Sequence, residues 1–419
     1  MAITKKKMQE YIPSTSWFAG DRALWVIIAV LSIISVLVVY SSSAKMAYDN
    51  AAIKSTTQFL QNQITALILG WGAMFIVNRI NSRDLLKITP IAYGVTIGLT
   101  MLVYVLGQST NGAARWISIA GFQFQPSEAL KITTTMYLAR QLAIRQDIID
   151  KIKIIPSFNV TTWSSPEQQR IFKEGFFPLL FPMLLSCCVI VPAHTSSAVL
   201  LFGVSMVVLM VGRVNFRELA KIVVIVFCGA LSLFMLGAGR ADTAGGRFST
   251  WVETWTTDRS DVASEDLSDT ERSMIAMYNG GLTGVGAGHS AMRVEMIHPE
   301  SDYAYAFFVE EYGSLLGVLL LVLYLWIFFR AITIFEECGT TFPALMVLGL
   351  AMMITCQALL HVAVTINILP ETGQTLPLIS RGGSALIFNA TALGMILSVS
   401  RQNMEHSHDA PKSQSMYEK

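Results

Sequence analysis

Long apolar stretches alternate with short polar segments along almost the whole chain. A helix that crosses a lipid bilayer needs about 20 mostly apolar residues. The fifth and sixth of these stretches are separated only by a turn around Pro192, and the fourth is the most polar. The pattern predicts ten transmembrane helices, over Ala23–Tyr40, Phe59–Val77, Ile88–Leu106, Ser127–Ala143, Phe176–Val191, Ser196–Val211, Leu219–Leu236, Tyr303–Phe329, Phe342–Val364 and Ala385–Val399.

The distribution of Lys and Arg predicts how these helices are oriented. Twenty of the 30 basic residues lie on the side of the two termini, nine lie on the other side, and Lys131 falls inside the fourth helix. Because cytoplasmic loops carry the excess of Lys and Arg, both termini are expected in the cytoplasm. The predicted organisation is a cytoplasmic N-terminus (1–22), a ten-helix membrane domain (23–401) with a cytoplasmic linker (144–175) and a large extracellular loop (240–302), and a cytoplasmic tail (402–419).

The composition favours a membrane protein and argues against nucleic-acid binding. Hydrophobic residues make up 53% of the chain and charged residues only 14%, whereas a soluble domain carries about 25% charged residues. The net charge of +1 provides no basic field for nucleic acid. We therefore expect an all-α polytopic membrane protein without a nucleic-acid partner.

The longest segment between predicted helices lies on the outer side, between the seventh and eighth helices. It spans 240–302, carries 11 acidic and five basic residues, and contains glycines from Gly280 to Gly288. The sequence is interpreted as non-helical here, and a structureless loop of that length is usually functional. The glycines match neither a P-loop nor a dinucleotide fingerprint, which leaves a phosphate nest as their functional interpretation.

Charged residues inside predicted helices indicate a polar site near the outer face. Glu128 and Lys131 lie three residues apart on one face of the fourth helix, where charges must be paired or must face a wet cavity. They form either a structural ion pair or part of a cavity that offers Lys131 to an anionic head group. Glu310 and Glu311, in the eighth helix, are expected to line the same cavity.

Two further residues have both a functional and a structural interpretation. Arg115 adjoins Trp116 in a short outer loop; this arrangement is typical of interfacial anchoring, but a guanidinium also suits phosphate. Asp302 directly precedes the eighth helix, either as its N-cap or as a general base. The histidines show no zinc-binding spacing. The residues alone thus indicate either a transporter or an enzyme that acts on a lipid with an anionic head group.

Six motifs occur in the order and at the spacing of a known family. Together they resemble the SEDS family (shape, elongation, division and sporulation proteins, including FtsW and RodA), from about Gly20 to Arg401. The opening Gly20–Asp21 and the segment Gly212–Asn215 are more similar to the FtsW branch, which favours division over elongation. The six motifs are Val39–Ser43, Asn111–Ile117, Phe124–Lys131, Asn279–Gly286, Pro299–Gly313 and Leu376–Ser384.

The resemblance implies a peptidoglycan glycosyltransferase that polymerises lipid II at the outer face of the bacterial cytoplasmic membrane. Asp302 matches the family's essential loop aspartate, and is expected to take the proton of the acceptor hydroxyl in an inverting displacement that releases polyprenyl pyrophosphate. Arg115 and Lys131 are expected to neutralise the pyrophosphate charge. The expected substrate-binding residues are Arg115, Gln125, Glu128, Lys131, Ser380 and Ser384.

The resemblance also implies partners and leaves alternatives. The partners are lipid II, the growing glycan strand, a class B penicillin-binding protein (an FtsI-like transpeptidase) and other divisome proteins. A divalent cation, magnesium or manganese, is a further expectation, and no organic cofactor is expected. The alternatives are a lipid II flippase, a scaffold for the transpeptidase and a RodA-like elongation polymerase. The gathering of polar groups at the outer end favours the enzyme over the flippase.

The sequence departs from the family pattern near the predicted site. Val191–Ser196 replaces the frequent Gln-Pro-Asp-Leu-Gly-Thr before the sixth helix. The stretch before Asp302 is short, and Arg381 replaces an aromatic or small residue. None of these departures removes Asp302 or the pair in the fourth helix.

Overall fold

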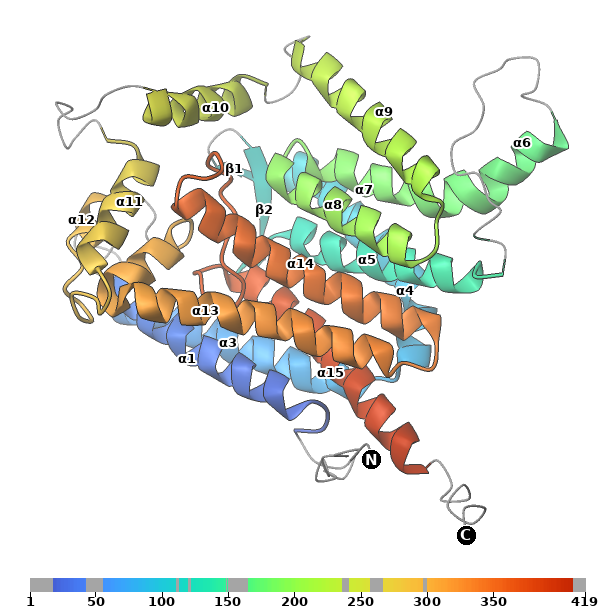
Figure 1. Cartoon of the computed structure of the whole chain (residues 1–419), viewed down its shortest axis with the longest axis horizontal. Coiled ribbons are helices and arrows are strands. Elements are labelled where there is room, and N and C mark those ends of the chain that lie inside the picture. Colours follow the sequence, from blue (N-terminus) through green and yellow to red (C-terminus); the bar gives the residue numbers. More distant parts are fainter. Residues whose placement is uncertain are drawn as a thin grey trace, which may run out of the picture.

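The chain folds into a bundle of long helices, with a small sheet and several shorter helices at one end (Figure 1). The computed structural model describes residues 18–42, 56–110, 113–119, 122–147, 149, 165–235, 241–256, 267–296 and 300–409. The predicted segments before residue 18 and beyond 409, together with residues 150–164 of the predicted linker, lie outside the described residues.

The observed helices confirm the predicted all-α multi-span fold. Seven are long and apolar enough to cross a membrane, and α8 is a shorter apolar helix. The helices that correspond to the ten predicted spans are α1 (Arg22–Ser42), α3 (Thr56–Asn78), α4 (Ser82–Leu106), α5 (Pro126–Ile144), the π-helical η3 (Phe172–Leu180) continued by α7 (Phe181–Ile190), α8 (Thr195–Val211), α9 (Phe216–Met235), α13 (Ala304–Glu336), α14 (Thr341–Thr365) and α15 (Gly383–Asp409). A short helix α6 (Pro166–Ile171) precedes η3.

The most polar predicted helix, α5, lies at the centre of the bundle. It packs against α4, α14, α8 and α7, so its threonines meet protein rather than lipid. Thr133 Oγ1 pairs with Thr96 at 2.7 Å and Thr134 Oγ1 donates to Ser186 at 2.9 Å. Gly349 lets α14 approach α5 closely, because a Cβ atom there would lie 2.4 Å from Thr135 Cγ2. A polar helix is tolerated at membrane depth because its polar groups are satisfied by neighbouring helices.

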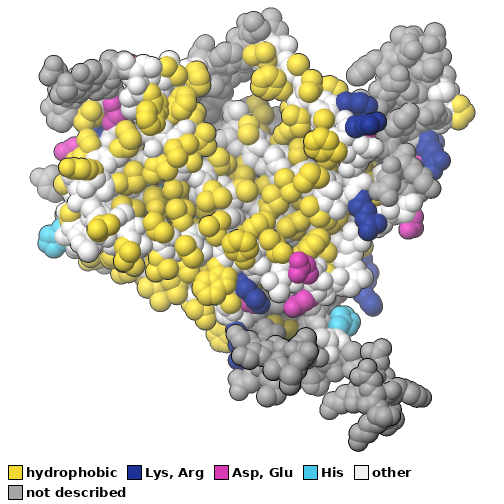
Figure 2. Space-filling view, in the orientation of Figure 1, with side chains coloured by type: hydrophobic (Ala, Val, Ile, Leu, Met, Phe, Trp, Pro, Cys, Tyr) yellow, Lys and Arg dark blue, Asp and Glu magenta, His cyan; other side chains and the backbone are white. Residues whose placement is uncertain are grey.

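The surface of the bundle is apolar over a broad band. Figure 2 shows hydrophobic side chains spread across the long helices, with several Lys and Arg side chains gathered at one end of the band. The band includes strongly exposed residues of α3, α4 and α13. Exposed apolar area of this extent is the surface that a protein presents to lipid. Examples are Ile76, Ile91, Val105, Leu315 and Phe329.

The two ends of the described chain meet at the same end of the bundle (Figure 1). Arg330, near the end of α13, forms an ion pair with Asp21 just before α1. Arg401 of α15 donates from Nε to the Asn78 carbonyl at 3.1 Å. This arrangement agrees with an even number of membrane crossings.

The predicted non-helical character of the loop 240–302 is wrong. Its described part contains α10 (Ala241–Thr256), α11 (Asp269–Gly280) and α12 (Met292–Glu295). A capping box starts α11: Glu271 N–H donates to Ser268 Oγ, and the Glu271 carboxylate accepts from Ser268 N–H. Ser-x-x-Glu is a sequence signature of a helix start, so the start of α11 is predictable from the sequence.

A small antiparallel sheet precedes α5 and departs from a purely helical fold. It contains β1 (Gln108–Thr110), β2 (Ala113–Ile119) and β3 (Phe122–Phe124) in that order. Gln108 pairs with Trp116, and Ile117 pairs with Phe124. The sheet fixes Arg115 on its central strand, close to the start of α5.

Candidate functional site

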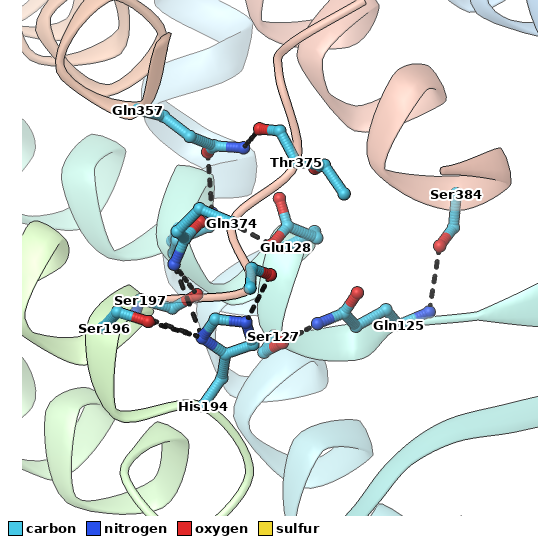
Figure 3. Close-up of polar contacts among 12 residues, drawn as sticks. Gln125, Ser127, Glu128, His194, Ser196, Ser197, Gln357, Gln374, Thr375 and Ser384 are labelled. Atoms are coloured by element: carbon cyan, nitrogen blue, oxygen red, sulfur yellow. Dashed lines mark hydrogen bonds and ion pairs between the residues drawn. The ribbon is translucent and has the colours of Figure 1, made fainter. Parts of the chain in front are cut away.

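Polar side chains from distant parts of the sequence meet at the end of the bundle that carries the sheet (Figure 3). They come from the start of α5, the turn before α8, the middle of α14, and the irregular chain between α14 and α15. Helix termini expose unpaired backbone groups, and two of these are satisfied by histidines: Ser197 N–H by His194 Nδ1 and Tyr305 N–H by His361 Nε2.

Glu128 and Lys131 form the ion pair that their spacing predicts. Lys131 Nζ lies 2.9 Å from Glu128 Oε1, and the two side chains are only 2% and 7% exposed. Lys131 also donates to Gln357 Oε1 at 3.0 Å, and Gln357 Nε2 donates to the Thr375 carbonyl at 3.0 Å. The pair is therefore buried and linked through Gln357 to the chain between α14 and α15.

Asp302 lies in a turn directly before α13, and backbone contacts hold the residues around it. Ser380 Oγ donates to the Ser301 carbonyl at 2.7 Å and accepts from Leu376 N–H at 2.8 Å. Arg381 N–H donates to the Glu300 carbonyl at 2.9 Å. The N-cap residue of α13 is Tyr303, so the capping interpretation of Asp302 does not describe how the helix begins. Asp302 itself is half-buried.

The chain between α14 and α15 runs in irregular conformation past this aspartate, and residues 371–375 are held by side chains. Each of these five consecutive carbonyls accepts a hydrogen bond from a different side chain. We refer to this stretch as the 371–375 segment. The bonds run from Arg247 Nη1 to Glu371 (3.4 Å), Ser196 Oγ to Thr372 (2.9 Å), His194 Nε2 to Gly373 (3.1 Å), His361 Nδ1 to Gln374 (2.7 Å) and Gln357 Nε2 to Thr375 (3.0 Å).

Gly373 lies between Asp302 and His194. A Cβ atom built on Gly373 would lie 4.0 Å from both Asp302 Oδ2 and His194 Nε2, and the glycine has a φ of +63°. Burial, followed by the positive charge of Arg115, lowers the pKa of His194 to about 3, and Lys131 and Arg247 act in the same direction. Gly373 thus lies beside both Asp302 and His194, and the charges of Arg115 and Lys131 act on the His194 ring.

The remaining predicted substrate-binding residues have partners within the protein. Gln125 N–H donates to Ser384 Oγ at 3.1 Å, and Gln125 Nε2 donates to Ser127 Oγ at 3.3 Å. Ser380 contacts Ser301, as described above. These contacts give Ser380 and Ser384 a role in holding the start of α13 and the start of α5. Their predicted role in binding substrate stays a prediction.

The expectation that Glu310 and Glu311 line the cavity is wrong. Glu310 is 0% and Glu311 1% exposed, and both hold the glycine-rich segment against α13. Glu310 Oε1 accepts from Ala291 N–H at 3.1 Å, and Glu311 Oε1 accepts from Gly288 N–H at 2.8 Å. Gly284 is needed for close packing, because a Cβ atom there would lie 2.2 Å from the Glu311 carbonyl oxygen.

A pocket of about 250 Å³ adjoins this site between α10, the start of α11 and the 371–375 segment. Its lining includes Trp251, Arg247, Asp269 and Glu371. Tyr303, the residue after Asp302, adjoins the pocket through Thr270, a lining residue whose Oγ1 lies 3.1 Å from the Tyr303 hydroxyl oxygen. Burial, then the charge of Glu371, raises the pKa of Tyr303. An aromatic side chain among a few polar groups is typical of a small-molecule site.

Candidate metal ligands are sparse in the described part of the chain. No three His, Cys, Asp or Glu side chains cluster there. Magnesium, however, is often bound by one or two carboxylates together with phosphate oxygens of the substrate. Asp302 is a single candidate carboxylate of that kind, and the predicted divalent cation stays a prediction.

Several residues of the site were missed from the sequence. His194, His361, Gln357 and Gln374 all contact the 371–375 segment or belong to it. The histidines were considered only as zinc ligands, for which their spacing is wrong. The one sequence feature that points to any of these residues is the departure from the family pattern at Val191–Ser196, which includes His194.

The fold and the site define a multi-span membrane protein with a buried charged centre and a half-buried carboxylate at one end of its bundle. The FtsW/RodA/SpoVE family profile, described as a cell cycle protein, matches residues 21–405. The chain therefore belongs to the FtsW/RodA/SpoVE family.

Individual relatives agree with this assignment. The chain is 27% identical over 389 residues to the probable peptidoglycan glycosyltransferase FtsW of Geobacter sulfurreducens, covering 91% of this chain and 95% of that protein. It is 26% identical over 384 residues to the protein of the same name from Coxiella burnetii, covering 90% and 95% of the two chains.

Solved structures share the fold. A chain of a peptidoglycan synthase complex aligns with a TM-score of 0.68 at 21% identity, covering 92% of this chain and 99% of that chain. The rod shape determining protein RodA of Thermus thermophilus aligns with a TM-score of 0.62 at 22% identity, covering 92% and 98%.

Proposed function

We propose that the protein is a peptidoglycan glycosyltransferase that polymerises lipid II at the outer face of the cytoplasmic membrane, for septal wall synthesis. The observation that carries the proposal is the position of Asp302, a half-buried carboxylate beside a segment fixed by five side-chain donors. The names of the relatives support the same activity.

The reaction is a displacement at the anomeric carbon of the lipid-linked end of the growing chain. The acceptor hydroxyl of lipid II attacks that carbon, polyprenyl pyrophosphate leaves, and the configuration inverts. Asp302 takes the proton of the attacking hydroxyl, a contribution of about 10²–10⁴-fold in rate. The fixed surroundings of Asp302 keep this base in place, which reduces the entropy lost on reaching the reactive geometry.

The positive charges near Asp302 stabilise the leaving group. Pyrophosphate gains charge as its bond to the sugar breaks, and fixed positive groups in a site with little water favour that change. Arg115 and Lys131 both act on His194 electrostatically, so their field reaches the region of Asp302. Lys131 acts from its buried position beside Glu128, whose Oε1 lies 2.9 Å from Lys131 Nζ. A divalent cation held by phosphate oxygens of the substrate and a carboxylate of the site would supply further charge neutralisation.

The pocket beside Asp302 provides a place for a sugar of the substrate. Trp251 offers an apolar indole surface, and Arg247, Asp269 and Glu371 provide polar groups around it. The indole N–H is already used, since it donates to the Asn367 carbonyl at 3.0 Å. Both substrates carry lipid tails, so the site lies where head groups meet the outer leaflet. This placement requires both termini in the cytoplasm, as the Lys and Arg distribution predicts.

The proposed partner is a class B penicillin-binding protein, which cross-links the strands that the polymerase makes. The likeness to a chain of a peptidoglycan synthase complex supports a partner of this kind.

The test is glycan formation from purified lipid II by the purified full-length protein, with and without the transpeptidase and with and without magnesium or manganese. Asp302→Asn removes the base with little change in shape and is expected to abolish polymer. Asp84→Asn is the matched control, because Asp84 is a solvent-exposed partner of Lys87 at the start of α4. Polymer from the Asp302→Asn variant at the wild-type rate would exclude Asp302 as the base. Transfer of lipid II across vesicles without polymer would indicate the flippase instead.

A further inference from the structure

The turn before α8 brings a histidine into the candidate site. His194 is 7% exposed and is the N-cap residue of α8. Its ring lies between the first turn of that helix and the 371–375 segment, as Figure 3 shows for His194, Ser196, Ser197 and Gln374.

The hydrogen bonds of His194 determine which nitrogen carries the proton. His194 Nδ1 lies 3.1 Å from Ser196 Oγ, 3.4 Å from Gln374 Nε2 and 3.4 Å from Ser197 N. Of these groups, the Ser197 backbone N–H can only donate. Nδ1 is therefore unprotonated, and the hydrogen of the neutral ring is on Nε2. Nε2 lies 3.1 Å from the Gly373 carbonyl, which can only accept. The ring is thus a neutral bridge between the α8 cap and Gly373.

A second histidine holds the next carbonyl in the same manner. Tyr305 N–H, in the first turn of α13, donates to His361 Nε2 at 3.4 Å, so the hydrogen of a neutral His361 is on Nδ1. His361 Nδ1 then donates to the Gln374 carbonyl at 2.7 Å. Two neutral histidines, from the start of α8 and from α14, therefore fix consecutive peptide groups beside Asp302.

His194 can affect Asp302 through Gly373, because the glycine that His194 holds lies beside the Asp302 carboxylate. A Cβ atom on Gly373 would be 4.0 Å from both Asp302 Oδ2 and His194 Nε2, so the glycine backbone forms a wall of the space next to the carboxylate. A shift of Gly373 would change the room for the acceptor sugar at the base. Surrounding positive charges, from Arg115, Lys131 and Arg247, disfavour a charged ring, in agreement with the neutral bridge.

We propose that His194 is a positioning residue for polymerisation: its Nε2–H holds the Gly373 carbonyl and thereby sets the backbone of Gly373 against Asp302. This inference rests on the proposed glycosyltransferase function. His194 does not need to touch substrate, and it acts through Gly373.

Two conservative substitutions separate the two bonds of the ring. His194→Asn places a carbonyl oxygen where Nδ1 lies, so it keeps the α8 cap but cannot reach Gly373. His194→Gln places an amide near the position of Nε2, so it can donate to Gly373 but loses the cap. His289→Asn is the control, because His289 is an exposed histidine in the glycine-rich segment. Each full-length variant is purified and assayed for kcat and KM with lipid II, and for thermal unfolding in detergent.

The expected pattern is a separation of rate from stability. His194→Asn lowers kcat about 10- to 100-fold, with KM changed by less than about threefold, since a displacement of about 1 Å costs on that order, and its melting temperature stays near wild type. His194→Gln keeps kcat within about fivefold but melts at lower temperature.

If His194 has a purely structural role, activity follows stability, and His194→Asn is then the more active of the two variants. Wild-type kcat in His194→Asn, or activity that follows stability, would overturn the positioning role while leaving the proposed function intact. Absence of polymer from the wild-type protein with its partner would overturn both.

Discussion

Ser380 Oγ donates a 2.7 Å hydrogen bond to the carbonyl of Ser301, the residue immediately before Asp302. The same hydroxyl accepts from Leu376 N–H at 2.8 Å, and its residue is 3% exposed. One buried hydroxyl therefore connects the turn before α15 with the turn before α13. The candidate base thus depends on a contact between segments that are 79 residues apart in the chain.

This relationship predicts that Ser380→Ala impairs turnover. Removing the hydroxyl releases the Ser301 carbonyl and leaves Leu376 N–H without its acceptor, so the backbone at Asp302 loses a restraint. We expect kcat for polymerisation to fall about tenfold with a smaller change in KM, because the loss is one of positioning. Ser249→Ala, at an exposed serine of α10, is the control and should match wild type. A Ser380→Ala variant with wild-type kcat would show that the contact does not matter for the reaction.

The buried pair of α5 predicts a specific pattern of stability. Lys131→Met leaves the Glu128 carboxylate buried without its cation, which is expected to lower the free energy of unfolding by about 3–5 kcal/mol. Adding Glu128→Gln removes that uncompensated charge, so the double variant should recover part of the loss. Thermal unfolding in detergent measures both. If the double variant is destabilised by the full sum of the two single losses, the two side chains are not coupled.

Glu310 is expected to matter for folding rather than for chemistry. Glu310→Ala leaves Ser290 Oγ and the N–H groups of Ala291 and Met292 without the carboxylate that accepts from them. An unpaired buried donor costs about 1–3 kcal/mol, so the melting temperature should fall clearly. Turnover of the folded fraction, measured well below that temperature, should stay within about threefold of wild type.

The matched control is Glu336→Ala, at an exposed glutamate near the other end of α13. It should leave both stability and turnover unchanged. Loss of turnover in Glu310→Ala without a loss of stability would show that Glu310 acts in the reaction rather than in folding.

The sequence allowed the helices and the charged centre to be predicted because both depend on local rules. Runs of about 20 apolar residues define spans, and Glu128, Lys131 and Asp302 were conspicuous because charges at membrane depth are rare. The histidine contacts were not predictable in this way, since His194 lies 179 residues from Gly373. The position of Glu310 was not predictable for a related reason: its partners are the Ser290 hydroxyl and two backbone N–H groups, about 20 residues earlier in the chain.

The histidine also predicts how stability depends on pH. The pKa of His194 is lowered to about 3 in the folded protein, against about 6.5 in an unfolded chain. Its contribution to stability is complete above pH 6.5 and is lost as the pH falls, because only the unfolded chain takes up the proton. Linkage gives a loss of about 2 kcal/mol in the free energy of unfolding between pH 7 and pH 5.

Denaturation in detergent at pH 7, 6 and 5 measures this loss, and comparison with His194→Asn isolates it. The variant has no group titrating at that position, so its free energy of unfolding should decline less than that of wild type by about 2 kcal/mol over the same interval. Most carboxylates titrate below pH 5, so this window reports mainly on histidines, and the other five histidines are present in both proteins. Equal declines in the two proteins would mean that His194 is protonated in the folded state near pH 6, and the neutral bridge to Gly373 would then be wrong.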